Sequence, residues 1–321
     1  MQTIGHYIDG ALSPGTSGLS APVFNPATGA QQAELALGSI ADVDAVVASA
    51  VTAFESWRSS SLSTRASIMF KFRELMDASR NELAELVSLE HGKVPSDALG
   101  EIARGMENVE FACGIPALLK GEYSEQVAGG VDVYSLRQPL GVVAGITPFN
   151  FPAMVPMWMF ANAIMCGNCF ILKPSEKDPS AALFMAKLLS EAGLPPGVFN
   201  VLQGDKVAVD RLLEHPQVKA LSFVGSTPIA RYVYETGSAH GKRVQALGGA
   251  KNHMLVLADA DINAAADAAV SAAYGSAGER CMAISVVVAV GAVADELIPA
   301  LTERIAKIVV GPGTDPKAEM G

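Results

Sequence analysis

Cys281 is the side chain of this 321-residue sequence best suited to act as a nucleophile. It stands in Gly278-Glu-Arg-Cys-Met282, between a helical pattern of small residues and the apolar run Ile284–Val290. A loop in that position presents its side chains, and the charge of Arg280 favours the thiolate, the reactive form of a cysteine. On this segment alone, a buried structural thiol stays open as the alternative.

Asn150 is the candidate for stabilising negative charge on a reacting oxygen. It lies in Ile146-Thr-Pro-Phe-Asn-Phe-Pro152, between aromatic residues and prolines, at the end of an expected strand. An amide that its surroundings hold in place can donate a hydrogen bond to an oxyanion. The alternative is an asparagine that forms a turn and nothing more.

Two further segments have the composition of a nucleotide site. Leu172-Lys-Pro-Ser-Glu176 follows an apolar run, and open parallel sheets bind nucleotides at the carboxyl ends of their strands. Glu176 can accept hydrogen bonds from ribose hydroxyls and would repel a 2′-phosphate, which favours NAD over NADP; a solvated loop charge is the alternative. In Phe223-Val-Gly-Ser-Thr227 a strand leads through Gly225 and Ser226 into a helix, whose free backbone N–H groups can hold a pyrophosphate.

The bulk composition predicts a globular protein that binds neither nucleic acid nor membranes. Half of the residues are apolar, so a chain of this length can bury a large core. The net charge of −10 and the pI near 5.0 leave no basic patch for a phosphate backbone or an anionic lipid surface. The longest apolar stretch, Phe151–Gly167, contains two prolines and is shorter than the roughly 20 residues of a spanning helix, so we expect a buried helix. The N-terminal residues show neither a signal peptide nor a transit pattern, which predicts a cytoplasmic location.

The four cysteines are too few to form a disulfide framework in a chain this long. Cys166-Gly-Asn-Cys169 has the spacing of half a zinc site, but no second pair or histidine cluster follows to complete four ligands. We therefore predict two buried structural thiols and no metal.

Helical periodicity dominates the first third of the chain. Apolar residues recur at three- and four-residue steps over Asp42–Trp57, Leu62–His91 and Ser96–Leu119, which predicts three amphipathic helices. After the turn signal Gly129-Gly130, the segment Val131–Leu136 alternates like a half-exposed strand.

The middle of the chain alternates between strand and helix patterns. Its short apolar runs are Leu140–Ile146, Cys169–Leu172, Val198–Leu202 and Ala220–Val224. That alternation is typical of βαβ units and of a parallel sheet that is buried on both faces. A second series begins at His253–Leu257 and continues through a helix from Asp261 to a strand at Ile284–Val290, so we expect two α/β domains that meet near Gly248-Gly249.

The second domain is expected to be incomplete. After a helix from Ala294 to Val309 the sequence ends at Gly321, which leaves this domain with two strands. Two strands rarely form a stable sheet alone. Either another chain completes the domain or the sequence is a truncated piece.

Taken together and in this order, these segments resemble the aldehyde dehydrogenase superfamily, and the match runs from Tyr7-Ile-Asp-Gly10 and Phe24-Asn-Pro-Ala-Thr-Gly29 to the end of the chain. The resemblance implies that Cys281 is the nucleophile and Asn150 the oxyanion donor. It also implies a cofactor site formed by Ile146, Thr147, Phe149, Lys173, Glu176, Gly225 and Ser226. The expected fold is a Rossmann-type NAD-binding domain, an assembly hairpin and an incomplete α/β catalytic domain, at residues 1–120 with 138–247, 121–137, and 248–321. The full-length form would be a homo-oligomer, a dimer or a tetramer.

One position departs from the hydrolytic members of that family. In those members the segment Gln245-Ala-Leu-Gly-Gly249 carries a glutamate that activates water, and here the position is Ala246, which cannot take a proton. The family gives the neighbouring Glu279 no role as a base. A thioester without that base would be hydrolysed slowly, whereas a thiol is a strong nucleophile that needs little help, so we expect coenzyme A as the acyl acceptor.

The strings Gly248-Gly-Ala-Lys-Asn-His253 and Gly278-Glu-Arg-Cys-Met-Ala283 resemble those of the CoA-acylating methylmalonate-semialdehyde dehydrogenases. That resemblance implies oxidation of malonate or methylmalonate semialdehyde with NAD, loss of carbon dioxide, and release of acetyl-CoA or propanoyl-CoA. Such substrates need a carboxylate anchor, for which Arg280 and Arg104 are the candidates and ordinary ion pairs the alternative. A hydrolytic NAD-dependent aldehyde dehydrogenase with a different base, and an inactive NAD-binding fragment, are the competing interpretations.

Overall fold

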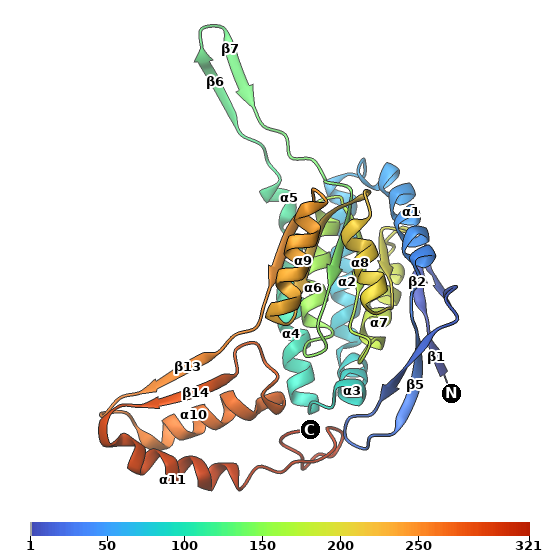
Figure 1. Cartoon of the computed structure of the whole chain (residues 1–321). Helices are drawn as coiled ribbons and strands as arrows, with labels where there is room; N and C mark the ends of the chain where they lie inside the picture. Colours follow the sequence, from blue (N-terminus) through green and yellow to red (C-terminus); the bar gives the residue numbers. More distant parts are fainter. Residues whose placement is uncertain (1) are drawn as a thin grey trace.

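The structure is a computed structural model that describes residues 2–321, and a seven-stranded sheet forms its centre (Figure 1). The strands lie in the order β12-β11-β8-β9-β10-β2-β3, namely Arg243–Leu247, Val218–Val224, Val142–Ile146, Cys169–Lys173, Phe199–Val201, His6–Ile8 and Ala11–Ser13. The first five are parallel, and β2 and β3 extend the sheet with antiparallel pairing. Every residue of β8, β9 and β10 is buried, so the predicted parallel sheet with two covered faces is confirmed.

Two groups of helices cover the sheet. One group contains α1 (Ile40–Trp57), α8 (Lys206–Glu214) and α9 (Thr227–Ala239). The other contains α6 (Met154–Met165) and α7 (Ser180–Glu191), with α2 (Leu62–Ala78), α3 (Arg80–His91) and α4 (Pro95–Cys113) packed outside them. The chain crosses the sheet one way from β8 through α6 and α7 to β10, and the other way from β11 through α9 to β12. Right-handed crossovers in opposite directions put these helices on opposite faces.

Two of the predicted helices are each interrupted, so the expectation of single helices was wrong. Leu62–His91 is divided into α2 and α3 at Ser79, whose φ of −103° and ψ of 8° are not helical. Ser96–Leu119 is divided into α4 and the short α5 (Ile115–Leu118) at Gly114. The apolar period continues across each break because both halves pack into the same core.

Short strands near the N-terminus were not predicted. β1 (Gln2–Ile4), β5 (Gln31–Ala36) and β4 (Ser20–Phe24) form a three-stranded sheet in that order. Their side chains alternate weakly between buried and exposed, and only a small cluster around Val23 and Leu35 lies beneath them. A pattern this weak does not stand out in the sequence.

A two-stranded hairpin projects from the body of the molecule (Figure 1). It is formed by β6 (Tyr123–Ala128) and β7 (Val131–Tyr134), all of whose residues are exposed. An isolated hairpin is marginally stable in water. It coincides with the segment 121–137 that the resemblance assigns to assembly.

The last part of the chain forms a separate lobe, at the lower left of Figure 1. There β13 (Asn252–Val256) and β14 (Ile284–Ala289) pair in parallel, with α10 (Ile262–Tyr274) and α11 (Ala294–Ile305) packed together beside them and two short 3₁₀ turns at Gly275–Gly278 and Gly291–Val293. The core of this lobe is small and centres on Val256, Ala266 and Leu297. The chain changes sheets between Leu247 and Asn252, and the domain boundary at residues 247 and 248 stays a prediction. No helix among residues 2–321 combines the length and the apolar character needed to cross a membrane.

Candidate active site

A cleft of about 380 Å³ brings together residues that were predicted from separate segments. Asn150 follows β8, Ser226 follows β11, and Cys281 lies in the loop before β14, and all three line this cleft. β8 and β11 are neighbours, yet the chain leaves them toward opposite faces of the sheet. Such a divergence opens a crevice at the carboxyl ends of the two strands, which is where open α/β sheets place their ligands.

The Asn150 side chain connects the two loops that would carry the chemistry. Its Nδ2 donates a hydrogen bond to the backbone oxygen of Glu279 at 2.6 Å, two residues before Cys281. An amide nitrogen carries two hydrogens, so one donor of Asn150 is left for a reacting oxygen. Asn150 is half-buried, which restricts the movement of its side chain.

The Cys281 loop has an unusual backbone. Ser276 and Ala277 have φ values of 52° and 53°, and Gly278 continues the left-handed turn with φ 75°. The left-handed conformation costs each non-glycine residue about 1–2 kcal/mol, so the surrounding contacts must hold this turn in place. Beyond the turn, Asn252 fixes the same loop at Cys281: its Nδ2 donates to the backbone oxygens of Cys281 and Ala283, both at 3.0 Å. Asn252 was not predicted; an amide at the start of the strand that pairs with the strand after Cys281 is the signal that could have identified it.

Cys281 is also the cysteine that solvent can reach. The other three thiols are free and less accessible: Cys113 and Cys169 are buried and Cys166 is half-buried. Burial raises the pKa of Cys169 to about 12 and also raises the pKa of Cys166, so both stay protonated thiols at neutral pH. Within residues 2–321, no three His, Cys, Asp or Glu side chains are grouped as a metal site requires.

The edge beside the cleft carries the predicted cofactor residues. Ile146 pairs with Lys173 across β8 and β9, and the Thr147 N–H donates to the Lys173 oxygen at 3.1 Å. Lys173 Nζ lies 3.2 Å from Glu176 Oε2, and the glutamate side chain is 47% exposed. Burial alone would raise the pKa of Glu176, but the charge of Lys173 and the hydrogen bonds around the carboxylate lower it, so Glu176 is ionised at neutral pH.

These residues fit a dinucleotide. The start of α9 has no side-chain cap, because Ser226 makes no capping hydrogen bond and residue 228 is a proline. Pro228 has no N–H, so the N–H groups of Thr227 and Ile229 are the ones at the start of this 13-residue helix that a phosphate could use. The hydroxyl of Thr147 is buried without a hydrogen-bond partner, and Phe149 lines the cleft beside Gly225.

The two candidate arginines differ in position. Arg280 lines the cleft, but its guanidinium turns back over Gly275 and pairs with Asp97 near the start of α4. Arg104 is exposed on α4 and is not among the residues that line the cleft. The structure thus brings Arg280 to Cys281 and leaves Arg104 outside.

Ala246 carries no group that could activate water. Ala246 lies on β12 opposite Phe223 of β11 and is half-buried. Among residues 2–321, the cleft lining contains one carboxylate, that of Glu279. Glu279 Oε2 lies 3.4 Å from His91 Nε2, and burial together with the charge of Lys93 lowers the pKa of His91 to about 3, so the ring is neutral at pH 7.

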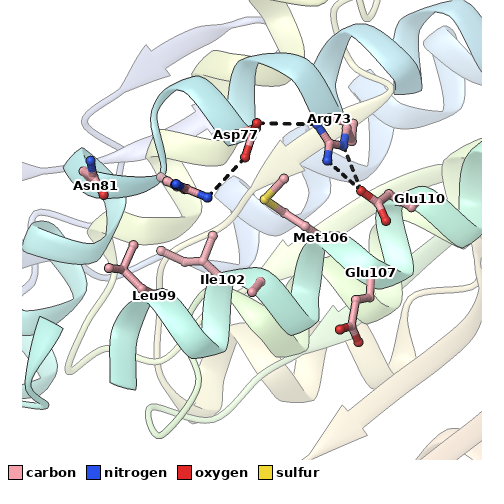
Figure 2. Close-up of a pocket in the computed structure, with 10 residues that line it drawn as sticks. Arg73, Asp77, Asn81, Leu99, Ile102, Met106, Glu107 and Glu110 are labelled. Atoms are coloured by element: carbon pink, nitrogen blue, oxygen red, sulfur yellow. Dashed lines mark hydrogen bonds and ion pairs between the residues drawn. The ribbon is translucent and has the colours of Figure 1, made fainter. Parts of the chain in front are cut away.

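A larger cavity of about 480 Å³ lies away from this chemistry, between α2, α3 and α4 (Figure 2). Arg73 bridges Asp77 and Glu110 along its rim, and Leu99, Ile102 and Met106 form its floor. None of the residues predicted for catalysis or cofactor binding lines it. Its size therefore says nothing about the reaction.

Comparison with known proteins places this geometry in a family. The profile of the aldehyde dehydrogenase family matches residues 14–321. The malonate-semialdehyde dehydrogenase of Pseudomonas aeruginosa is 53% identical over 322 residues, which cover 100% of this chain and 65% of that protein. Malonate-semialdehyde dehydrogenase 3 of Geobacillus kaustophilus is 52% identical, with 100% and 66% covered. The chain thus spans about 65% of the length of the curated relatives it matches.

Solved structures agree with the sequence relatives. A candidate methylmalonate-semialdehyde dehydrogenase from Sinorhizobium meliloti, complexed with NAD, superimposes with a TM-score of 0.98 at 55% identity, over 100% of this chain and 66% of that one. The methylmalonate-semialdehyde dehydrogenase of Oceanimonas doudoroffii gives 0.97 at 56% identity, over 99% and 65%. With a cleft that joins Cys281 to Asn150 at the edge of a parallel sheet, the chain belongs to the aldehyde dehydrogenase family.

Proposed function

We propose that the protein oxidises malonate or methylmalonate semialdehyde with NAD and transfers the acyl group to coenzyme A. The observation that carries the proposal is the cleft that joins Cys281 to Asn150 while Ala246 stands where hydrolytic relatives have their base. The names of the relatives support the semialdehyde, and the NAD complex of the Sinorhizobium meliloti structure supports the cofactor. Coenzyme A rests on the absence of the base and on the family resemblance.

The chain's own residues account for the first steps. The Cys281 thiolate attacks the aldehyde carbon, and the carbonyl oxygen becomes an oxyanion that the second Asn150 hydrogen and the Cys281 backbone N–H stabilise. Bound NAD would supply the acceptor for the hydride that leaves this carbon. Lys173 and Glu176 would hold its ribose, and the start of α9 would hold its pyrophosphate. What is left on Cys281 is a thioester.

The same donors serve the later steps. The substrate carboxylate lies β to the thioester carbonyl, so its C–C bond can break with release of carbon dioxide, and the electron pair passes to an enolate whose oxygen Asn150 stabilises. Protonation of the enolate carbon gives an acetyl or propanoyl thioester. The coenzyme A thiol then takes the acyl group and releases the Cys281 thiol. Arg280 holds the substrate carboxylate before it leaves, and to do so its guanidinium must turn from Asp97 toward the cleft.

Assembly and domain organisation belong to the same proposal. We assign residues 1–120 and 138–247 to NAD binding, 121–137 to assembly and 248–321 to part of the catalytic domain. The projecting hairpin exposes Tyr123, Val127, Val133 and Tyr134, an apolar set that a second copy would cover. Sedimentation of the whole gene product should show a dimer or a tetramer, and a monomer that stays monomeric at high concentration would contradict this assignment.

The test is NADH production from malonate semialdehyde with and without coenzyme A. The 321-residue chain is assayed beside the whole product of its gene, because the chain spans 65% of its relatives. Cys281→Ala should abolish NADH formation. Cys166→Ala is the matched control, because it removes a half-buried thiol outside the cleft and should leave the rate unchanged.

Each outcome separates one interpretation. Activity that needs coenzyme A and yields acetyl-CoA supports the proposal. NADH formation that ignores coenzyme A and yields malonate indicates a hydrolytic enzyme with a different base. If the whole gene product is active and the 321-residue chain binds NAD without turnover, the chain is an inactive NAD-binding fragment. If the whole gene product folds but oxidises neither semialdehyde, the proposed function is wrong.

A further inference from the structure

A fully buried ion pair lies behind the Asn150 loop. Lys93 Nζ and Glu101 Oε2 are 2.6 Å apart, and both side chains are 0% exposed. Removing two charges from water is unfavourable unless each also satisfies its remaining hydrogen-bonding capacity. The groups that Lys93 and Glu101 bind besides each other therefore indicate the role of the pair.

Both members of the pair bind the segment Asn150–Met154. Lys93 Nζ donates to the backbone oxygen of Asn150 at 2.7 Å. Glu101 Oε1 accepts from the Ala153 N–H at 2.7 Å and from the Met154 N–H at 3.1 Å. The pair thus connects the carbonyl of Asn150 to the first turn of α6 through two charged groups.

The pair is carried by a rigid support. Glu101 belongs to α4, and Lys93 follows Gly92, which ends α3 in the left-handed conformation with φ 94°. One turn after Glu101, Gly105 lets α4 approach α6 so closely that an added Cβ would lie 2.2 Å from Met157 Cε and 3.2 Å from Met154 Cα. The two charges are therefore fixed relative to α6 and cannot follow a displaced loop.

The other side of Asn150 is held by the second contact. Its side chain reaches the Glu279 oxygen at 2.6 Å, so the residue spans from Lys93 to the Cys281 loop. Asparagine has a short side chain, and the position of its amide follows that of its backbone. A backbone shift of about 1 Å would move the donor by a similar amount, which is enough to cost a reaction about 10²-fold.

We propose that Lys93 and Glu101 are positioning residues for Asn150: they hold its backbone so that its amide faces the oxygen bound at Cys281. This inference rests on the proposed function for its effect on rate. Its structural part, the immobilisation of residues 147–153, does not depend on any activity. Neither side chain touches the cleft, so the pair acts through Asn150.

The test compares two buried lysines. Lys93→Met removes the donor to Asn150, and Lys242→Met is the matched control, because Lys242 is also buried and donates to two backbone oxygens, those of His215 and Val218. Because Glu101 would be left buried and unpaired, Lys93→Met is also made together with Glu101→Gln, which removes both charges and keeps an acceptor for the Ala153 N–H. All variants are made in the whole gene product and checked for a cooperative unfolding transition.

Two readouts are expected to change together. Amide hydrogen exchange in peptides covering residues 147–153 should accelerate about tenfold or more in the Lys93→Met/Glu101→Gln variant and stay unchanged in Lys242→Met. The kcat of that double variant should fall about tenfold to hundredfold while KM for NAD changes less than twofold. In the Asn150→Ala background the same double change should cost less than twofold, because the group that it positions is gone.

Results that contradict the positioning role differ from results that contradict the proposed function. Equal losses in both backgrounds, unchanged exchange at 147–153, or a variant that loses stability while keeping its kcat would each overturn the positioning role. If Asn150→Ala itself keeps full activity, the proposed oxyanion role of Asn150 fails, and the exchange measurement then decides on the structural part alone. A double variant that does not fold, beside a folded Lys242→Met, would assign the pair to general stability and overturn the inference.

Discussion

The buried ring of His91 should make the free energy of unfolding sensitive to acid, and the size of the effect follows from the structure. Its side chain is 3% exposed and lies behind the catalytic loops, with its ring 6.2 Å from that of Phe149 and its Nε2 3.4 Å from Glu279. Burial and the charge of Lys93 lower the pKa of the ring to about 3, from 6.5 in an unfolded chain. In the folded protein the His91 ring therefore stays neutral over a pH range in which the same ring in the unfolded chain takes up a proton.

The sign and the size follow from that difference. Below pH 6.5 the unfolded state binds more protons than the folded state, so the free energy of unfolding falls as the pH falls toward 3. Relative to pH 8, the loss that His91 causes is about 0.4 kcal/mol at pH 6.5 and about 2 kcal/mol at pH 5. Above pH 7 His91 contributes almost nothing to the pH dependence of stability.

The perturbation is His91→Phe, which keeps a ring beside Phe149 and cannot take a proton. The Lys93 N–H loses its bond to His91 Nδ1, so the variant should be about 1 kcal/mol less stable than the wild type at pH 8. At pH 5 the order should reverse, with the variant about 1 kcal/mol more stable. His253→Gln is the matched control, because His253 is exposed and its replacement should shift neither end of the curve.

The assay is guanidinium chloride unfolding at pH 5 to 8, followed by tryptophan fluorescence, for which Trp57 is a buried reporter inside the main core. Other titrating groups, including His6, are common to both proteins and cancel in the difference between them. The reasoning is refuted if the difference in unfolding free energy between wild type and His91→Phe stays constant from pH 8 to pH 5.

Three more changes test other parts of the molecule. Burial and the charges of two nearby glutamates raise the pKa of Asp178 well above its usual value, so the folded state holds a proton at pH values at which the unfolded state has lost it. Asp178→Asn should raise the unfolding free energy at pH 8, and its advantage over the wild type should grow with rising pH in the same titration. Gly105→Ala should lower the unfolding free energy by about 1–3 kcal/mol in thermal melts, because its Cβ would collide with Met157, whereas Gly100→Ala on the same helix meets no atom within 4 Å and should stabilise by up to about 1 kcal/mol. If the proposed function holds, Ala246→Glu should raise NADH formation without coenzyme A about tenfold or more, since it restores a base; an unchanged coenzyme A requirement would contradict that role of the position.

The parallel sheet and the edge that carries the site could be predicted because they depend on local patterns. The runs that became β8, β9 and β11 are short, apolar and separated by helical periods, and the polar segments after each of them must meet at one edge of a parallel sheet. Asn150, Lys173 and Ser226 were identified by type and by their place after a strand. The structure then added the strand order, which puts the strands before Asn150 and Ser226 side by side.

The helix boundaries could not be predicted in the same way. Ser79 divides α2 from α3 without a proline or a glycine, and the apolar period runs through it because both helices bury the same side. The residue acts as the end of one helix and the start of the next, which needs the two axes to diverge. That divergence is set by the packing of α2 and α3 on α7, far along the chain.

The residues that support the site are harder to recognise in a sequence than the residues that react. Cys281 and Asn150 are recognisable because their chemistry requires particular residue types in loops at strand ends. Glu101 offers a weaker signal: it falls on the buried face of α4 beside Ala98 and Ile102, and a carboxylate on an apolar face requires a partner. Lys93 lies only eight residues before Glu101, but Gly92 and Val94 separate it from both helices, so no regular spacing marks the pair. Nothing local shows that both charges end on the Asn150 loop, because those bonds join segments 50 or more residues apart. Reacting groups can therefore be predicted from residue type, whereas the groups that position them are found when burial and hydrogen bonds are known.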